Sequence, residues 1–202
     1  VLFRSLFKIK KIVELARWAD IIHFQKCFSY VSIPAIFAGI WTGTPVHYDW
    51  DDWEAEIFKT SSKDTFWFNY LDRIEKSIPY LVDTISVASK ALWDRATKMG
   101  ISHTNIFMAP VGGNLERFCM DSTDAGPVRE QYVLKPNVVT YMGQLHGAQY
   151  CDLFLEMAAH LVKERQDITY LVIGNGSRFL ELMKKSEELG LQDHVEIGRA
   201  HV

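Results

Sequence analysis

Apolar and polar residues follow one another in blocks that predict short buried strands separated by amphipathic helices. The strands are short apolar runs bounded by turn residues, and the helices are longer segments with apolar positions three or four residues apart. We expect strands at 20–24, 45–48, 83–88, 106–109, 138–143, 168–174 and 194–196, with helices at 6–18, 32–40, 65–81, 89–100, from about 152 and from 178. Strands that alternate with helices are typical of parallel sheets, so the pattern predicts an α/β fold.

A polar segment divides this pattern into two halves. Residues 119–136 contain Gly126, Pro127 and Pro136, and we interpret them as a linker with one short helix. With 48% apolar residues among 202, the chain can form one large or two small cored domains. We therefore expect one parallel-sheet unit at 6–118 and another at 137–196, both incomplete.

The two ends of the chain look foreign to this pattern. Val1–Ser5 and Ile197–Val202 back-translate, within codon degeneracy, to common sequencing-adapter sequence in opposite orientations. We expect residues 1–5 and 197–202 to be adapter-derived and leave them out of the fold prediction, as for a cloning scar.

Composition and charge narrow the class of protein. A net charge of −3 gives no reason to expect a nucleic-acid partner. Cys27, Cys119 and Cys151 lie far apart and in no metal-ligand spacing, which favours a reducing, cytoplasmic compartment. No apolar run reaches the roughly twenty residues of a membrane span. The lysine-rich face within residues 8–11 is either solvated or in contact with the anionic inner surface of a membrane, and both interpretations stay open.

The stretch 138–154 has the most informative local pattern. It predicts a buried strand that ends at Gly143, a polar loop, and a helix that begins near Asp152. Such a junction places backbone N–H groups and a helix N-terminus where open α/β sheets bind phosphorylated ligands. The pattern recurs at Gly174 and Gly176. These glycines either let the backbone approach a nucleotide or simply turn the chain, because Gly-x-Gly without a third glycine is a weak signal.

An acidic turn follows the strand predicted at 45–48. Asp49, Asp51 and Asp52 are so crowded that their carboxylates must be solvated, paired or bound to a cation. Clustered carboxylates suit hard cations, but acidic residues also complement the dipole at a helix start. We expect a functional role for this turn without a metal ion.

Two shorter motifs complete the prediction. The helix at 65–81 contains four aromatic residues within 66–70, and aromatic residues at this spacing usually belong to a core. Gly112 and Gly113 either let the backbone approach a ligand or make a tight turn, and neither interpretation is preferred.

In chain order, seven motifs resemble those of the retaining glycosyltransferases of family four. They are DIIHF, PVHYDWDD, DTISVASKAL, APVGGNLERF, VVTYMGQL, ITYLVIGNGS and LGLQDHV, and together they span nearly all of residues 6–196. The resemblance implies the GT-B architecture of two Rossmann-like domains. Residues 6–118 would be the rear of the acceptor domain, and residues 137–196 the front of the nucleotide-sugar domain.

The resemblance also implies an activity and a set of site residues. A hexosyl-type transferase of polysaccharide biosynthesis would move a sugar, with retention of configuration and without a cofactor, from a nucleotide-diphosphate sugar to a hydroxyl of a glycan, lipid or small-molecule acceptor. Around the donor it implies Gly143, Gln144, Gly174 and Gly176, with Asp51 as the catalytic candidate and Asp49, Asp52, Gly112, Gly113 and Asn114 on the acceptor side.

Some positions depart from the family's pattern. A basic residue usual in the first donor loop is replaced by Gln144, and a later lysine by Ala148 or Gln149. An amide can hydrogen-bond phosphate but supplies no charge. Asp51 stands where many relatives have histidine, and the family's paired glutamates would lie beyond Glu196.

Other functions stay open for these reasons. One alternative is a catalytically silent nucleotide-binding domain of the same fold, and another is a magnesium-dependent phosphohydrolase that uses Asp49, Asp51 and Asp52. A nicotinamide-dependent oxidoreductase is disfavoured, because Phe179 stands where a third glycine is needed.

Overall fold

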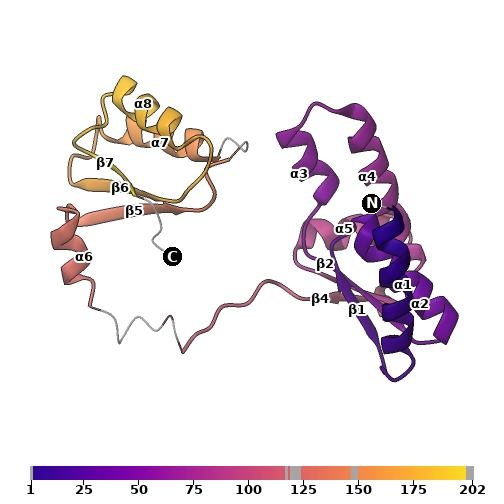
Figure 1. Cartoon of the computed structure of the whole chain (residues 1–202). Coiled ribbons are helices and arrows are strands. Elements are labelled where there is room, and N and C mark those ends of the chain that lie inside the picture. The colour runs from indigo at the N-terminus through magenta and orange to yellow at the C-terminus, as the bar shows by residue number, and fades with distance from the viewer. Residues whose placement is uncertain (1, 117, 119–123, 147–149, 199–202) are drawn as a thin grey trace. The chain divides into compact units, whose positions relative to one another are not determined.

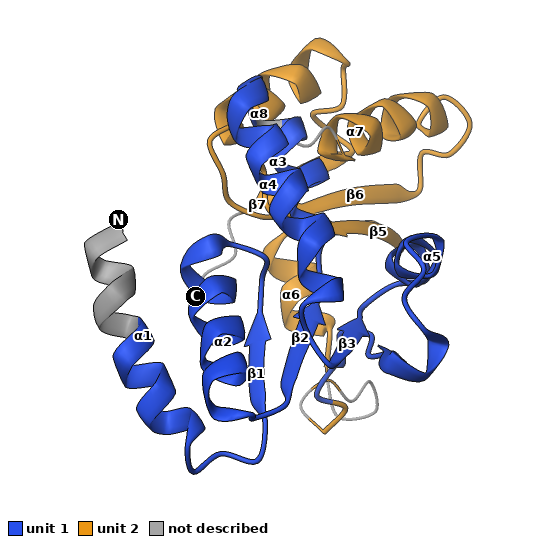
Figure 2. Cartoon of the chain, turned by 90° about the vertical axis from the view of Figure 1, so that its right-hand side faces the viewer, with its two compact units in different colours: residues 1–114 blue, residues 115–202 orange. Residues whose placement is uncertain are grey.

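The structure is a computed structural model of the 202 residues that describes all but residues 1, 117, 119–123, 147–149 and 199–202. The side chains of 2–8 and 61 are also outside the description. The chain divides into two compact units, residues 1–114 and 115–202, coloured separately in Figure 2. Each unit contains one parallel sheet flanked by helices (Figure 1), which confirms the predicted α/β class with two sheets.

Unit 1 contains a four-stranded sheet of order β1-β2-β3-β4. Its strands are β1 (Ile22–Gln25), β2 (Val46–Trp50), β3 (Thr84–Val87) and β4 (Ile106–Met108). Its helices are α1 (Leu2–Ala16), α2 (Ser29–Thr42), α3 (Glu54–Ser61), α4 (Thr65–Ser77) and α5 (Lys90–Lys98), with 3₁₀ turns η1 (Ile78–Tyr80) and η2 (His103–Asn105).

The two faces of the unit 1 sheet differ in polarity. Register pairs Phe24 with Tyr48 and Tyr48 with Ile85, and all three belong to the core that the helices cover. The alternate positions, His23, His47 and Thr84, are also in register and form a row of polar side chains on the opposite face. This alternation follows from the twofold period of a strand.

Helix ends in unit 1 follow their local sequence. The Ser89 hydroxyl accepts a hydrogen bond from the backbone N–H of Leu92 at the start of α5, as the N-cap preference predicts. After α5 the chain turns at Gly100, whose φ of +85° favours glycine. Similarly, Gly43 with a φ of +74° ends α2.

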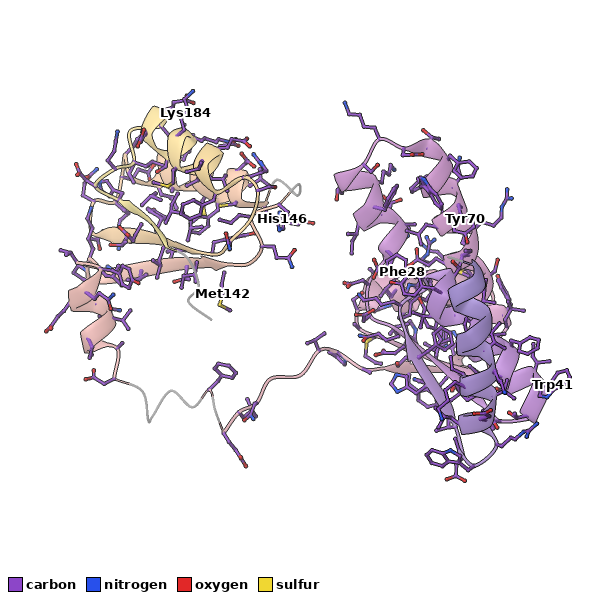
Figure 3. All side chains as sticks on the ribbon, viewed as in Figure 1. Phe28, Trp41, Tyr70, Met142, His146 and Lys184 are labelled. Atoms are coloured by element: carbon purple, nitrogen blue, oxygen red, sulfur yellow. The ribbon has the colours of Figure 1, made fainter. Side chains whose placement is uncertain are left out.

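The aromatic prediction for α4 is largely wrong. Phe66 and Trp67 have 71% and 54% of their surface exposed, and Tyr70 is also exposed, whereas Phe68 packs against the core. Figure 3 shows Tyr70 on the outside of this helix. The aromatic residues of α4 do not share one face of the helix, so only part of the cluster meets the core.

Unit 2 contains a three-stranded sheet of order β5-β6-β7. Its elements are α6 (Gly126–Gln131), β5 (Asn137–Met142), α7 (Tyr150–Leu161), β6 (Ile168–Ile173), α8 (Phe179–Glu188) and β7 (Val195–Gly198). Helix α6 lies in the segment predicted as a linker. The core joins Tyr170 and Val172 to Leu155 of α7 and Leu182 of α8. Strand β7 runs two residues beyond its predicted end, to Gly198.

The described cysteines are unpaired, and the described helices are too short or too polar to span a membrane. These cysteines, Cys27 and Cys151, are buried and form no disulfide. None of the described helices is long and apolar enough to cross a membrane.

Candidate functional site

In unit 2, the loops that follow β5 and β6 are bonded to each other through their backbones. Gly143 N–H donates to the Ile173 carbonyl at 3.0 Å, and Leu145 N–H donates to the Asn175 carbonyl at 3.0 Å. Arg178 N–H, at the start of α8, donates to the Leu145 carbonyl at 3.1 Å. Hydrogen bonds between backbone atoms therefore join the loop after β5 to the loop after β6. These are the two strand–loop–helix junctions predicted from the sequence, and they lie together at one edge of the sheet.

Gly174 and Gly176 are required by this contact between loops. A Cβ atom at Gly174 would lie 2.1 Å from the Gly143 carbonyl oxygen, and one at Gly176 would lie 2.2 Å from the Leu145 carbonyl oxygen. Real side chains do not approach backbone so closely, so no larger residue fits without moving the loop. The structure thus gives both glycines a packing role, which neither interpretation of the sequence had included.

Gly143 and Gln144 are placed differently. A Cβ atom at Gly143 would first meet the Tyr141 hydroxyl, at 3.3 Å, which is the flexible end of a side chain. Gln144 is exposed. Met142 and His146, which precede and follow this loop segment in the sequence, are labelled in Figure 3. Ala148 and Gln149 lie outside the described residues.

His146 and Ser177 form a contact that the sequence analysis missed. The backbone N–H of Ser177 donates to His146 Nδ1 at 3.2 Å, and the Ser177 hydroxyl lies 3.2 Å from the same nitrogen. The contact joins the two loops at their exposed ends. No spacing rule relates residues 31 positions apart, so only the paired strands reveal it.

Beneath the junction, charged side chains join α7 to α8. Arg178 donates to Asp152 at 2.6 Å and to Glu181 at 2.6 Å, and Lys185 donates to Asp152 at 3.1 Å. The hydrogen bonds from Arg178 hold the pKa of Asp152 below its ordinary value. The carboxylates of Asp152 and Glu181 therefore offset the charge of Arg178. Arg178 is the positively charged residue nearest in sequence to the loop after β6.

In unit 1, the predicted acidic turn starts later than expected. Strand β2 continues through Asp49 to Trp50, so Asp49 is a strand residue and not part of the turn. Its carboxylate accepts a hydrogen bond from the Ser86 hydroxyl at 2.7 Å and lies 3.9 Å from His23 Nε2. The carboxylates whose ligand atoms lie within 4.8 Å of one another are those of Asp51, Asp52 and Glu54, a group that does not include Asp49.

Lys26 contacts the remaining carboxylates of the turn and offsets part of their charge. Its Nζ lies 2.9 Å from Asp51, 2.6 Å from Asp52 and 2.8 Å from Glu54. Lys26 has a φ of +74°, a backbone conformation that non-glycine residues rarely adopt. Partial burial opposes protonation, yet the hydrogen bonds to Asp52, Glu54 and Asp51 raise the pKa of Lys26. The carboxylates lie close enough to hold a metal ion, with ligand atoms within 4.8 Å of one another, and the ammonium group contacts all three.

Glu75 of α4 fixes the turn from the core side. Its buried carboxylate accepts from Trp50 Nε1 at 2.9 Å and from the backbone N–H groups of Glu54 and Ala55 at 2.9 and 3.1 Å. It therefore satisfies the first N–H groups of α3, which has no side-chain cap of its own. Burial raises the pKa of Glu75 although these hydrogen bonds act in the opposite direction.

A hydrogen-bonded row on the polar face leads to Asp49. His47 Nδ1 lies 2.8 Å from the Thr84 hydroxyl, and His47 Nε2 lies 3.0 Å from the Ser86 hydroxyl. Burial, followed by the neighbouring His23, lowers the pKa of His47. Because Ser86 donates to Asp49, His47 Nε2 must carry the proton donated to Ser86. The row could not be recognised from the sequence, because its members come from different strands.

The loop after β4 contains the remaining predicted residues. Gly112, Gly113 and Asn114 are exposed, and a Cβ atom at either glycine would meet no atom within 4 Å. Neither glycine has a positive φ. Local packing within the described structure therefore does not require glycine here.

Comparison with known proteins connects this geometry to one family. Residues 127–199, within unit 2, match the family model described as glycosyl transferases group 1. The protein named colanic acid biosynthesis glycosyl transferase WcaI of Escherichia coli K12 is 25% identical over 122 residues, which are 59% of this chain and 30% of WcaI.

Solved structures show the same fold. Anabaena Alr3699/HepE, solved in complex with UDP, superposes with a TM-score of 0.75 at 16% identity, over 95% of this chain and 51% of that one. A glycosyltransferase of Rickettsia africae gives a TM-score of 0.69 at 18% identity, over 98% of this chain and 52% of that one. The chain thus spans about half the length of these structures.

The comparisons do not favour a phosphohydrolase or a silent binding domain. At these identities the structural likeness establishes the fold alone, which is that of GT-B glycosyltransferases. The family match within unit 2 and the similarity to WcaI indicate a glycosyltransferase group 1 type domain in residues 127–199.

Proposed function

We propose that this chain forms part of a retaining glycosyltransferase that moves a hexosyl group from a nucleotide-diphosphate sugar to an acceptor hydroxyl. The observation that carries the proposal is the joined β5 and β6 junction, in a unit that matches a glycosyltransferase family model. The complex of HepE with UDP supports a nucleotide-diphosphate donor for a protein of this fold.

The donor diphosphate would bind mainly through the backbone N–H groups of Gln144 and His146, because those of Gly143 and Leu145 already donate to the Ile173 and Asn175 carbonyls. A side chain at Gly143 would press on Tyr141, whose hydroxyl lies 3.3 Å from the Cβ position, and so would disturb the loop proposed to hold the donor. Arg178 is engaged by Asp152 and Glu181, and Gln144 is neutral, so the described side chains supply little positive charge. Backbone dipoles and the α8 N-terminus would then offset the charge of the leaving diphosphate.

The reaction would exchange one bond at the anomeric carbon for another on the same face. The bond from this carbon to the diphosphate oxygen breaks as the bond to the acceptor oxygen forms. The acceptor proton passes to the departing diphosphate, so the leaving group itself supplies the base. The protein's contribution is to hold both partners and stabilise the developing charge.

Asp51 and Asp52 would orient the acceptor without a metal ion. Lys26 and Glu75 already set the conformation of their turn, so the carboxylates need no cation to remain close together. Asp49, Gly112, Gly113 and Asn114 would belong to the same side of the enzyme.

Product analysis in the full-length enzyme tests this proposal. Incubation with UDP-sugars and acceptor, followed by proton NMR of the new glycoside, should show the donor's anomeric configuration. Turnover should persist in excess chelator and fall in Asp51→Asn, but not in the matched exposed variant Asp193→Asn. An inverted product would exclude the retaining mechanism, and turnover lost in chelator would favour a metal-using transferase or phosphohydrolase.

A further inference from the structure

Unit 1 contains a cavity of about 540 Å³ that none of the predicted site residues lines. Its walls come from Trp53, from Lys76 near the end of α4, from Tyr80 of η1, and from α5 with Asp94, Arg95 and Lys98. This volume lies in the range of small-molecule sites, roughly 300–1,000 Å³. Its position on the helical side of unit 1 separates it from the polar face of the sheet.

The charge of the cavity wall favours an anion. Lys76, Arg95 and Lys98 supply three cations, whereas Asp94 supplies one carboxylate and is paired with Lys90. Lys76 is paired with Asp72 at 2.5 Å, but more than half of its side chain remains exposed. The aromatic ring of Tyr80 adds apolar surface beside these charges.

Several buried donors of the same wall have no acceptor. Trp53 Nε1 and the Nε and Nη2 atoms of Arg95 are buried without a hydrogen-bond partner among the described residues. The Arg95 guanidinium lies over the Trp53 ring, 3.9 Å from its centroid, and its closest ion pair, to Asp72, spans 3.6 Å. Unpaired buried donors cost free energy, and all three require an acceptor.

We propose that this cavity binds a small organic oxyanion, namely a carboxylate or phosphate on a sugar-sized carbon skeleton. Arg95 and Lys98 receive the oxyanion. The skeleton packs against Tyr80. None of the proposed donor and acceptor residues lines this site, although Trp53 directly follows Asp52, and the proposal does not depend on the transferase activity.

Titration of the whole chain followed by the indole N–H resonance of Trp53 tests the proposal. The probes are glucuronate, glucose 6-phosphate and neutral glucose, which share a ring but differ in charge. Either oxyanion, or both, should shift the resonance saturably, whereas glucose should not. A response to one oxyanion alone identifies the source of the charge and supports the site.

Variants link the response to the cavity. Lys98→Ala removes an exposed cation, and we expect its affinity for the responding probe to fall roughly tenfold, the effect of one charge-assisted hydrogen bond. Lys163→Ala, an exposed lysine of unit 2, should bind as the parent does. Arg95→Lys keeps the charge but loses the planar fork, and should also weaken binding.

The proposal fails if no probe shifts the Trp53 resonance, or if glucose binds as well as the oxyanions. It also fails if Lys98→Ala and Lys163→Ala bind equally. Because Lys98 is exposed, these outcomes do not depend on whether Arg95→Lys folds.

Discussion

The acidic turn of unit 1 and the glycine loops of unit 2 are fixed in different ways. Charged side chains hold the turn, because Lys26 contacts three carboxylates and Glu75 accepts three hydrogen bonds. In unit 2 the loops are held by backbone hydrogen bonds and by the close approach that Gly174 and Gly176 allow.

This difference predicts which substitutions each region tolerates. The turn should respond to the loss of a charge and to pH, since its partners are ionisable. The loops should be sensitive to larger side chains at Gly174 and Gly176. A new Cβ atom at either position would lie only 2–3 Å from backbone atoms of the neighbouring loop. An anionic ligand that binds through backbone N–H groups suits the second arrangement, because it needs close approach more than charge.

The largest effect should come from Gly176→Ala. Its Cβ atom would meet three backbone atoms of Leu145 at 2.2–2.8 Å, so the first loop must move. We expect unit 2 to lose about 3 kcal/mol of unfolding free energy, the upper range for overpacking. Urea titration with hydrogen-exchange readout of β6 measures this loss.

The matched control for that change is Gly113→Ala, where a Cβ atom meets no atom within 4 Å. It should alter stability by less than about 0.5 kcal/mol. Equal stabilities of the Gly176→Ala and Gly113→Ala variants would show that close glycine packing does not hold the loops.

A smaller effect is expected from Lys26→Met, which keeps side-chain length but removes the charge. Asp51, Asp52 and Glu54 would then repel one another, at a cost to unit 1 of about 1–2 kcal/mol. Thermal unfolding at low and high salt should show the loss shrinking as salt screens the carboxylates.

Lys59→Met provides the comparison for Lys26. Lys59 forms an exposed pair with Glu56 at 3.6 Å, and such pairs contribute little. If the Lys26→Met and Lys59→Met variants were equally stable, the three-carboxylate cluster would not depend on Lys26.

The smallest effects should be opposite pH slopes in the two units. The folded pKa of Glu75 is raised above its ordinary 4.5, so its stabilising contribution is present below that pH and is lost as pH rises through the folded pKa. The folded pKa of Asp152 is lowered below 3.8, so its contribution is present above that pH and is lost as pH falls through the folded pKa.

Unfolding measurements between pH 2 and 8 test these slopes, each at most about 1.4 kcal/mol per pH unit for one proton. Glu75→Gln should remove the decline of unit 1 with rising pH, and Asp152→Asn should flatten the acid limb of unit 2. Slopes of the same sign in both units would contradict the assigned environments.

Sequence alone predicted the strands well because buried parallel strands are short apolar runs between turn signals. Ser89 and Gly100 marked the ends of α5 through local capping chemistry, which needs no knowledge of the tertiary structure. The aromatic face of α4 failed as a core prediction, because a helical pattern does not show which aromatic residues meet a neighbouring element.

The partners of the candidate site could not be predicted in this way. Lys26 lies 25 residues before Asp51, and Glu75 lies 24 residues after it. The pairing of parallel strands and the packing of α4 bring both residues to the turn. Likewise, the packing role of Gly174 and Gly176 depends on a loop some thirty residues earlier. Such contacts depend on how neighbouring strands are aligned with each other, and the periodicity of a single strand does not predict this register.

The central claim, that backbone around Gly143 binds the donor diphosphate, can be tested directly by titration with UDP. The parent chain should show shifts of the backbone amides in residues 143–146, and Gly143→Val should abolish binding while leaving the unfolding midpoint close to that of the parent. Gln144→Ala should lose roughly 0.5–1.5 kcal/mol of binding free energy, and Gln144→Arg should gain roughly 1.5–3 kcal/mol through a charge-assisted contact. Equal binding of UDP by Gly143→Val and the parent, or no amide shifts in the parent, would contradict the donor-site assignment.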